Sequence, residues 1–412
     1  MVFLPEYDAV ARVTPGGSHP PLHTQGRSAR IVSYRLLRDG PLTQARLVDV
    51  TGLSRPTVAG ALERLQADGL VEAEASAQQA GGGAGRRPLV FRLTRKAGVA
   101  VGVEIGRRHI QIVVADGGHR QLVDVPPTKL TIHADRDPST VLDQVVTLVR
   151  RCRALAGTDL PILGLGLGLP TPLTLDGRVG SDTFLPAWTS VDPRQELAAH
   201  LDEIPIHVAN DASLGALGEY TFGAGRGRRD LTYVKFGTGI GAGIVIGGRL
   251  HLGAGGTAGE LGHVTVDHQG ERCPCGNRGC VEVYAGGPAL INNARQAGLE
   301  VDDVPDLVRR AGEGNTVCIR VIEEAATILG TAIGTMIQLL SPELLVLGGS
   351  LSAAGDLLRT PLRLALRRAV MPPAVNALSI EFAHLGRTAS AWGGVALAID
   401  RFTTHGPSDG QP

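Results

Sequence analysis

One short stretch of the chain carries four side chains of the kind that bind soft metal ions. His263 is followed by three thiols, Cys273, Cys275 and Cys280, within the segment HVTVDHQGERCPCGNRGC. One imidazole and three thiolates form a complete ligand set for a tetrahedral Zn²⁺ ion. The spacing therefore predicts one structural Zn²⁺ ion per chain, held by protein ligands alone. The alternative is a metal-free loop whose cysteines stay reduced.

Carboxylates flank this cluster on both sides. Glu260 lies three residues before the histidine, and Glu282 lies two residues after the last cysteine. Gly276 and Gly279 stand between the thiols, where a ligand loop must turn tightly. We therefore expect the metal to organise a polar site as well as to hold a loop.

The composition limits the class of protein. The chain has 412 residues, enough for two or three domains, and a formal charge of zero. Any contact with nucleic acid must therefore depend on a local surplus of positive charge. The remaining cysteines, Cys152 and Cys318, are expected to be buried apolar side chains and not part of a disulfide framework. With no signal-like start and no long apolar run, the sequence predicts a soluble, cytoplasmic protein with no membrane partner.

The first hundred residues change in texture twice. Residues 1–26 are rich in proline and glycine, which predicts a flexible tail. Helical spacing of apolar residues follows, with Thr43 and Ser54 as expected helix caps and a glycine turn at Gly52. The expected elements are helices over 28–39, 43–50 and 54–68, and strands at 70–72 and 89–93.

Three helices followed by a hairpin are typical of a winged helix-turn-helix, which we place at 27–94. This segment has ten arginines and six acidic residues, so positive charge gathers where DNA binding needs it. The third helix would enter the major groove, and the wing tip would reach the backbone or the minor groove. The expected DNA contacts are Ser54, Arg55, Thr57, Arg64, Arg86 and Arg87. For each arginine the alternative is a solvated surface charge.

Beyond residue 95, strands alternate with helices, which predicts mixed α/β sheets covered by helices. The expected strands are 99–105, 110–115, 162–169, 206–208, 231–236 and 344–347, with a hairpin near 244–248. The expected helices are 141–154, 317–338 and 389–399.

The motif GTAGELGH, followed by C-x-C-G-x-x-G-C-x-E, resembles the ROK family of repressors, uncharacterised reading frames and sugar kinases. The resemblance covers residues 95–400, and the winged helix matches the family's repressor branch. It implies a two-lobed α/β fold of the actin-like ATPase type. Lobe I is expected at 95–222, closed by a C-terminal helix at about 385–402, and lobe II at 223–384.

The resemblance also implies roles for individual residues. His263, Cys273, Cys275 and Cys280 match the family's zinc ligands. The positions that match sugar contacts are Asn210, Asp211, Glu260, His263 and Glu282, with Asp211 at the position of the kinase base. Carboxylates and an amide suit a ligand with several hydroxyls. The alternative for the Asn210-Asp211 pair is a strand-end turn or a helix cap.

The phosphate-binding loops only partly follow the family pattern. FGTGIGAG at 236–243 resembles the second phosphate loop, and VLGGSLS at 346–352 resembles the adenosine side. In the first loop, Glu104 replaces the usual aspartate, and Gly106 is followed by Arg107-Arg108 in place of Gly-Gly-Thr. Arginines would crowd the approach of a phosphate, although arginine can itself bind one. We therefore do not expect efficient use of ATP.

Together these features predict a sugar-responsive transcriptional regulator, a repressor that binds a pseudo-palindromic operator as a homodimer or homotetramer. Closure of the lobes on a sugar would shift the spacing of the paired winged helices. Two alternatives remain. One is an ATP-dependent sugar kinase with an appended DNA-binding domain, and the other is a DNA-bound activator without an effector.

Overall fold

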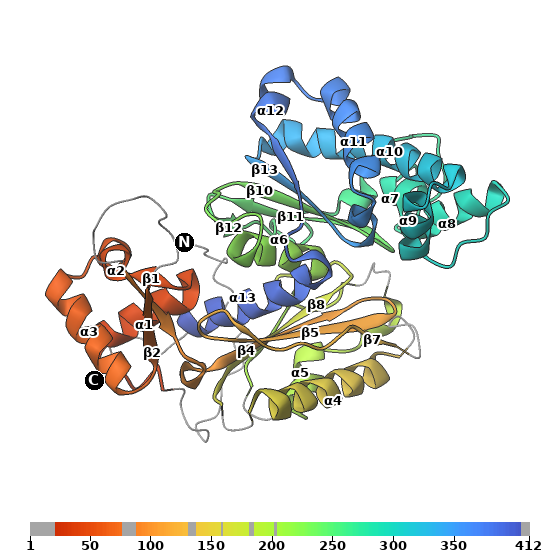
Figure 1. Cartoon of the computed structure of the whole chain (residues 1–412). Coiled ribbons are helices and arrows are strands. Elements are labelled where there is room, and N and C mark those ends of the chain that lie inside the picture. Colours follow the sequence, from red (N-terminus) through yellow and green to blue (C-terminus); the bar gives the residue numbers. More distant parts are fainter. Residues whose placement is uncertain are drawn as a thin grey trace.

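The computed structural model describes residues 21–75, 88–130, 137–157, 160–180, 185–201 and 204–404. Within these residues three β-sheets, of three, six and five strands, follow one another along the chain. Figure 1 shows the N-terminal module, in red and orange, beside a body in which the two larger sheets lie on either side of two central helices.

The N-terminal module is a winged helix-turn-helix, as predicted. The hydroxyl of Thr43 accepts a hydrogen bond from Arg46 N (3.3 Å) and caps the second helix, while Ser54 caps the third through Thr57 N (3.3 Å). Strand β1 is an addition to the predicted elements, and it pairs with β3. The elements are α1 (Arg27–Asp39), β1 (Leu42–Thr43), α2 (Gln44–Thr51), α3 (Arg55–Ala67), β2 (Val71–Ala75) and β3 (Leu89–Leu93).

The predicted flexible tail over 1–26 is wrong for its last residues. The side chain of Leu22 is fully buried, and the ring of His23 stacks on Phe402 with centroids 4.3 Å apart. Burial of this leucine ties residues 21–26 to the packed module. Residues 1–20, and the predicted wing-tip contacts Arg86 and Arg87, lie outside the described residues.

A six-stranded mixed sheet forms the first lobe, in the order β6-β5-β4-β8-β9 with β7 paired to β5. β4 and β8 run parallel and are almost wholly buried because helices cover both faces. Trp188, from the loop after β8, is buried in this lobe's core. The elements are β4 (Val99–Ile105), β5 (His109–Asp116), β6 (Gln121–Val123), β7 (Thr128–Lys129), α4 (Pro138–Ala156), β8 (Ile162–Leu169), α5 (Pro193–Ala198) and β9 (Ile206–Asn210).

The second lobe is built on a five-stranded sheet in the order β12-β11-β10-β13-β14. Its core lies between this sheet and the long helix α10, which buries Cys318. Within the described residues, no helix combines the length and the apolar character that a membrane crossing requires. The elements are β10 (Leu231–Phe236), β11 (Ile240–Ile246), β12 (Arg249–Leu250), α7 (Val281–Ala285), α8 (Gly287–Gln296), α9 (Val304–Gly312), α10 (Thr316–Leu340), β13 (Leu344–Gly348), α11 (Asp356–Ala369), α12 (Pro372–Ala377) and β14 (Ser379–Phe382).

Two helices, α6 (Asp211–Phe222) and α13 (Ala389–Thr404), lie back to back between the sheets (Figure 1). Glycines let their backbones approach: a Cβ added at Gly393 would lie 1.8 Å from Leu214 O. α13 packs on β4 and β8 of the first lobe, which supports the predicted closing helix at about 385–402, although the lobe division stays a prediction. α6 also packs on β10 and β11, so the predicted boundary between lobes at residue 222 stays a prediction.

A continuous apolar core joins the N-terminal module to the first lobe. Leu37 and Leu93 of the module belong to the same buried cluster as Val113 of β5 and Val395 of α13. All four side chains are fully buried. Burying this much apolar surface on both sides of a junction favours a rigid attachment.

Polar contacts reinforce the same junction. The ring of His119, in the turn after β5, is bonded through Nε2 to Leu37 O at 2.7 Å. Arg120, the next residue, pairs with Glu72 (2.8 Å) and Glu74 (2.7 Å) of β2. The module is therefore held to the turn after β5 along both α1 and β2.

Candidate effector cleft and metal centre

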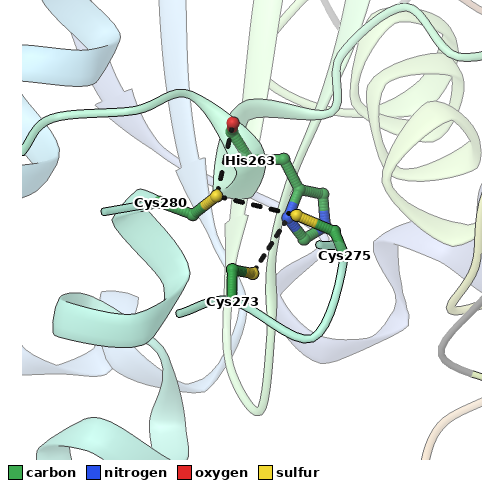
Figure 2. A group of neighbouring side chains, drawn as sticks. All are labelled: His263, Cys273, Cys275 and Cys280. Atoms are coloured by element: carbon green, nitrogen blue, oxygen red, sulfur yellow. Dashed lines mark hydrogen bonds between the residues drawn. The ribbon is translucent and has the colours of Figure 1, made fainter. Parts of the chain in front are cut away.

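The four predicted metal ligands converge from one loop and its flanks, as Figure 2 shows. Their ligand atoms all lie within 4.8 Å of one another. His263 Nδ1 is 3.6 Å from Cys273 Sγ, and the Sγ atoms of Cys275 and Cys280 are 3.7 Å apart. Tetrahedral Zn–N and Zn–S bonds require ligand separations of about 3.5 to 3.8 Å. The cluster can hold a metal ion, and its donor set and spacing fit zinc.

Glycines give the ligand loop its shape. Gly276 and Gly279 have φ angles of +94° and +65°, which side chains other than glycine rarely adopt. A Cβ at Gly279 would also lie 1.6 Å from Asp267 O, so no larger residue fits there. The glycines that the sequence places between the thiols are therefore required by the backbone.

The cluster connects the two segments that carry the flanking carboxylates. Glu260 directly precedes the 3₁₀ turn Leu261–His263, and its Oε2 lies 4.0 Å from His263 Nε2. Cys280 is the residue before α7, in which Glu282 is the second residue. A metal bound at the four ligands would therefore fix Glu260 and Glu282 relative to each other.

A cleft between the lobes brings the predicted effector residues together. Asn210, Asp211, Glu260, His263 and Glu282 all line it. Other parts of its wall come from the ends of β4, β10 and β13, the start of β5 and the 3₁₀ turn before α13, and include Glu104, Arg107, His109, Lys235, Ser350 and Arg387. His109, Lys235 and Arg387 are additions to the site residues predicted from the sequence.

Asn210 has a structural task besides any ligand contact. Its Oδ1 accepts hydrogen bonds from Ala212 N (2.9 Å) and Ser213 N (3.1 Å), and so caps α6. Its Nδ2 donates to Thr171 O at 3.1 Å. The helix-cap alternative therefore holds for Asn210, and the second N–H of its amide has no hydrogen-bond partner among the residues that the structure describes. Asp211, the first residue of α6, lies on the wall of the cleft.

Lys235 ties two buried carboxylates together in the cleft wall. Its Nζ donates to Glu104 Oε1 (2.5 Å) and to Asp211 Oδ2 (2.7 Å). Burial opposes the charge on Lys235, but the two carboxylates outweigh it and raise its pKa. Burial raises the pKa of Asp211, with Lys235 acting in the opposite direction. A signal was present in the sequence, since Lys235 is one of three lysines and lies just before a glycine turn.

Glu260 and Glu282 complete an acidic wall with Asp211. Burial raises the pKa of Glu260 to about 7, and the charges of Asp211 and Glu282 act in the same direction. Glu282 Oε2 accepts a hydrogen bond from Ile240 N at 2.8 Å, which fixes its carboxylate. Three grouped carboxyl groups offer many acceptors, and ligand hydroxyls are the natural donors to them.

The two segments that resemble phosphate loops are short and tightly packed. Of the segment 236–243, only Gly237, Thr238 and Gly239 form a turn, since β11 begins at Ile240. At the first loop, a Cβ on Gly106 would lie 2.3 Å from the ring of His109. This ring therefore crowds the backbone there. Of the two arginines predicted to do so, Arg107 lines the cleft and Arg108 is not among the lining residues.

The described DNA-contact candidates lie on or beside α3. Arg55 is exposed at its first turn. The hydroxyls of Ser54 and Thr57 are 2.7 Å apart and bonded to each other, so both take part in the cap. A Cβ at Gly26 would lie 3.0 Å from the guanidinium of Arg64, which places that group beside the start of α1. Their contacts with DNA stay a prediction.

Comparison with known proteins agrees with this architecture. The model of the ROK family matches residues 100–401, and that of the MarR family matches residues 26–80. The xylose repressor of Bacillus spizizenii is 25% identical over 377 residues, which cover 90% of this chain and 95% of the repressor.

Two solved structures are similar over most of their length. One is a ROK family transcriptional regulator described as a homolog of the E. coli MLC protein (TM-score 0.71, 24% identity, 91% of this chain and 96% of that chain). The other is a ROK family glucokinase from Streptomyces griseus in complex with glucose and AMPPNP (TM-score 0.62, 27% identity, 73% and 99%). They confirm the predicted fold class, a winged helix followed by a two-lobed actin-like sugar kinase fold. The match to the ROK family model extends over well more than half of this chain, and the chain therefore belongs to the ROK family.

Proposed function

We propose that the protein is a transcriptional repressor whose affinity for operator DNA changes when a sugar or sugar derivative binds the cleft. The observation that carries the proposal is the attachment of a winged helix-turn-helix to the lobe that forms half of a carboxylate-lined cleft. Similarity to a xylose repressor over 90% of the chain supports it. Binding to a pseudo-palindromic operator would require a homodimer or homotetramer.

The cleft is suited to a ligand with several hydroxyls. Asp211, Glu260 and Glu282 supply acceptors, and Asn210 supplies one N–H. Such a site rejects a ligand that leaves these groups unpaired. We propose that one Zn²⁺ ion, bound by His263, Cys273, Cys275 and Cys280, holds the segments of Glu260 and Glu282 in place.

Two helices connect the cleft directly to the DNA-binding module. α6 starts at Asp211 in the cleft and ends, roughly 18 Å away, at Phe222, whose ring lies 4.9 Å from that of His119. α13 starts beside Lys235 and ends near Arg38 of α1, which lies 3.5 Å from Asp400. A ligand that moves the first turns of these helices would therefore act on the module's attachment.

A thermal-shift screen of neutral sugars tests the effector assignment, because a ligand that binds only the native state raises its stability. At least one sugar should raise the melting temperature of the zinc-loaded protein. The rise should shrink after EDTA treatment and in Glu282→Gln. A screen in which no sugar or phosphosugar gives a rise would instead favour a regulator without an effector.

A sugar kinase is the second candidate, favoured by the likeness to a glucokinase and by the glycine turn at 237–239. A coupled ADP-release assay with a panel of hexoses decides between the two. Turnover of about 1 s⁻¹ or above, an ordinary enzyme rate, would overturn the proposal of a repressor without catalytic activity.

Arg55 offers a test of the DNA-binding helix. If it contacts a base edge, Arg55→Ala should weaken operator binding by roughly 1–3 kcal/mol and leave random DNA nearly unaffected. An equal loss on both DNAs would make it a phosphate contact. Fluorescence anisotropy at one fixed salt concentration measures both affinities.

A further inference from the structure

A single ammonium group fills the space between two buried carboxylates in the cleft wall. Lys235 Nζ lies 2.5 Å from Glu104 Oε1 and 2.7 Å from Asp211 Oδ2, and Ser390 Oγ lies at 3.5 Å. The side chains of Glu104 and Asp211 are only 3% and 12% exposed. One oxygen of each carboxylate lies within hydrogen-bonding distance of the same nitrogen. The two carboxylates therefore converge on a common centre.

This centre has the kind of ligands that a hard divalent cation would use. Mg²⁺ binds oxygen atoms of carboxylates and usually accompanies the phosphates of a nucleotide. The glycine turn at 237–239 follows Lys235 closely in the same cleft. A lysine at the centre supplies a permanent positive charge there. It also repels a second cation at short range, in a site where water screens charge poorly.

We infer that Lys235 determines ligand specificity as a tethered cation, which takes the place of a divalent metal ion between Glu104 and Asp211. It thereby closes the cleft to a metal-bound nucleotide while leaving it open to a neutral sugar. The contact uses one oxygen of Asp211 and leaves the other for a sugar hydroxyl. This inference deepens the proposed function. It rests on that proposal only for the assignment of a sugar as the ligand of the cleft.

The position of the ion pair supports a role in the cleft. Glu104 lies near the end of β4 in the first lobe, just before the first phosphate loop. Lys235 belongs to β10 of the second lobe. An ion pair with only a structural role would show the same contacts. After loss of the lysine, however, it would not be expected to bind a divalent cation in its place. Two buried carboxylates without a cation between them repel each other. A divalent cation would neutralise this repulsion only if the geometry of the two carboxylates suits its coordination.

The test measures the melting temperature of zinc-loaded Lys235→Ala in about 10 mM MgCl₂ and in NaCl of equal ionic strength. We expect Mg²⁺ to raise the melting temperature of this variant by roughly 3 °C or more and to leave the wild type unchanged. Lys235→Arg keeps the positive charge and should not respond to Mg²⁺. The double variant Lys235→Ala/Glu104→Gln lacks one carboxylate and should also not respond.

A folded Lys235→Ala protein that ignores Mg²⁺ would overturn the inference. If this variant does not fold without added metal, refolding in MgCl₂ and in NaCl gives the answer. Recovery in MgCl₂ alone supports a vacated cation site, and failure in both salts contradicts it. None of these readouts needs DNA or sugar, so they stand apart from the tests of the proposed function.

Discussion

The junction between the N-terminal module and the first lobe is apolar, whereas the junction between the two lobes is polar. The junction between the N-terminal module and the first lobe is an apolar core in which Leu37, Leu93, Val113 and Val395 are fully buried. The junction between the two lobes is a polar cleft, walled by carboxylates and crossed by the Lys235 ion pair. Apolar packing resists sliding, whereas a polar, ligand-binding gap can open and close at small cost.

The contrast between the two junctions indicates which parts of the molecule should move together. The DNA-binding module and the first lobe should behave as one body, because no boundary between their cores exists in the described residues. The second lobe should move relative to that body when a ligand bridges the cleft. Helices α6 and α13 take part in both junctions, so they would carry the movement from one to the other.

The largest expected effect comes from the contact between these two helices. In Gly393→Ala the new Cβ would lie 1.8 Å from Leu214 O, which the backbone must move to avoid. We expect a loss of at least about 3 kcal/mol of unfolding free energy, measured by urea denaturation. Gly60→Ala is the matched control, because Gly60 is also helical but has no atom near its Cβ position. It should be neutral or stabilising by up to about 1 kcal/mol. Equal effects of the two changes would mean that α6 and α13 are not packed backbone to backbone.

A pH dependence tests the first junction. Burial lowers the pKa of His119 to about 4, from an ordinary value of 6.5. The folded protein therefore prefers the neutral ring. Stability should be unaffected above pH 6.5 and should fall by about 1.4 kcal/mol per pH unit as the pH drops from 6.5 towards 4. His119→Gln can keep the bond to Leu37 O but does not titrate, so it should lack this part of the pH dependence. If the wild type and the variant lose stability in parallel, His119 is not buried at the junction.

Removal of the metal tests the second junction. Cys275→Ser should release zinc, as elemental analysis would show, and should lower sugar affinity roughly tenfold or more, because Glu260 and Glu282 lose their common support. DNA binding in the absence of sugar should persist, since the four metal ligands belong to the second lobe, whereas the winged helix shares its core with the first lobe and α13. Retention of a full equivalent of zinc would refute the ligand assignment.

The smallest expected effect concerns an exposed ion pair at the first junction. Arg120→Ala removes the contacts to Glu72 and Glu74, whose side chains are 39% and 51% exposed. Because water and salt screen such pairs, stability should fall by about 1 kcal/mol or less. Hydrogen exchange should nevertheless increase in β2. Arg359→Ala, which breaks an exposed pair with Asp356 in the second lobe, is the control and should leave β2 unchanged. A similar increase with both variants would argue against a specific junction contact.

Local features of this fold could be predicted because their signals lie close together in the sequence. The caps at Thr43 and Ser54, the strand 99–105 and the metal loop each depend on neighbouring residues, and the structure has all of them. The packing of residues 21–26 could not be predicted, because His23, next to the buried Leu22, stacks on Phe402 at the far end of the chain. The same applies to Lys235, whose partners are separated from it by 131 and 24 residues. Such contacts exist only after the sheets have come together.

The proposed regulation requires that a ligand in the cleft change the affinity of the winged helix for DNA. Its most direct test is operator affinity, measured by fluorescence anisotropy at fixed salt, with and without a sugar that calorimetry has shown to bind the zinc-loaded protein. We predict that saturating sugar changes the operator Kd by about fivefold or more, as coupled sites typically do. Glu282→Gln should reduce the change together with sugar affinity. An unchanged operator Kd at saturation, for every sugar that binds, would contradict the proposed regulation by sugar.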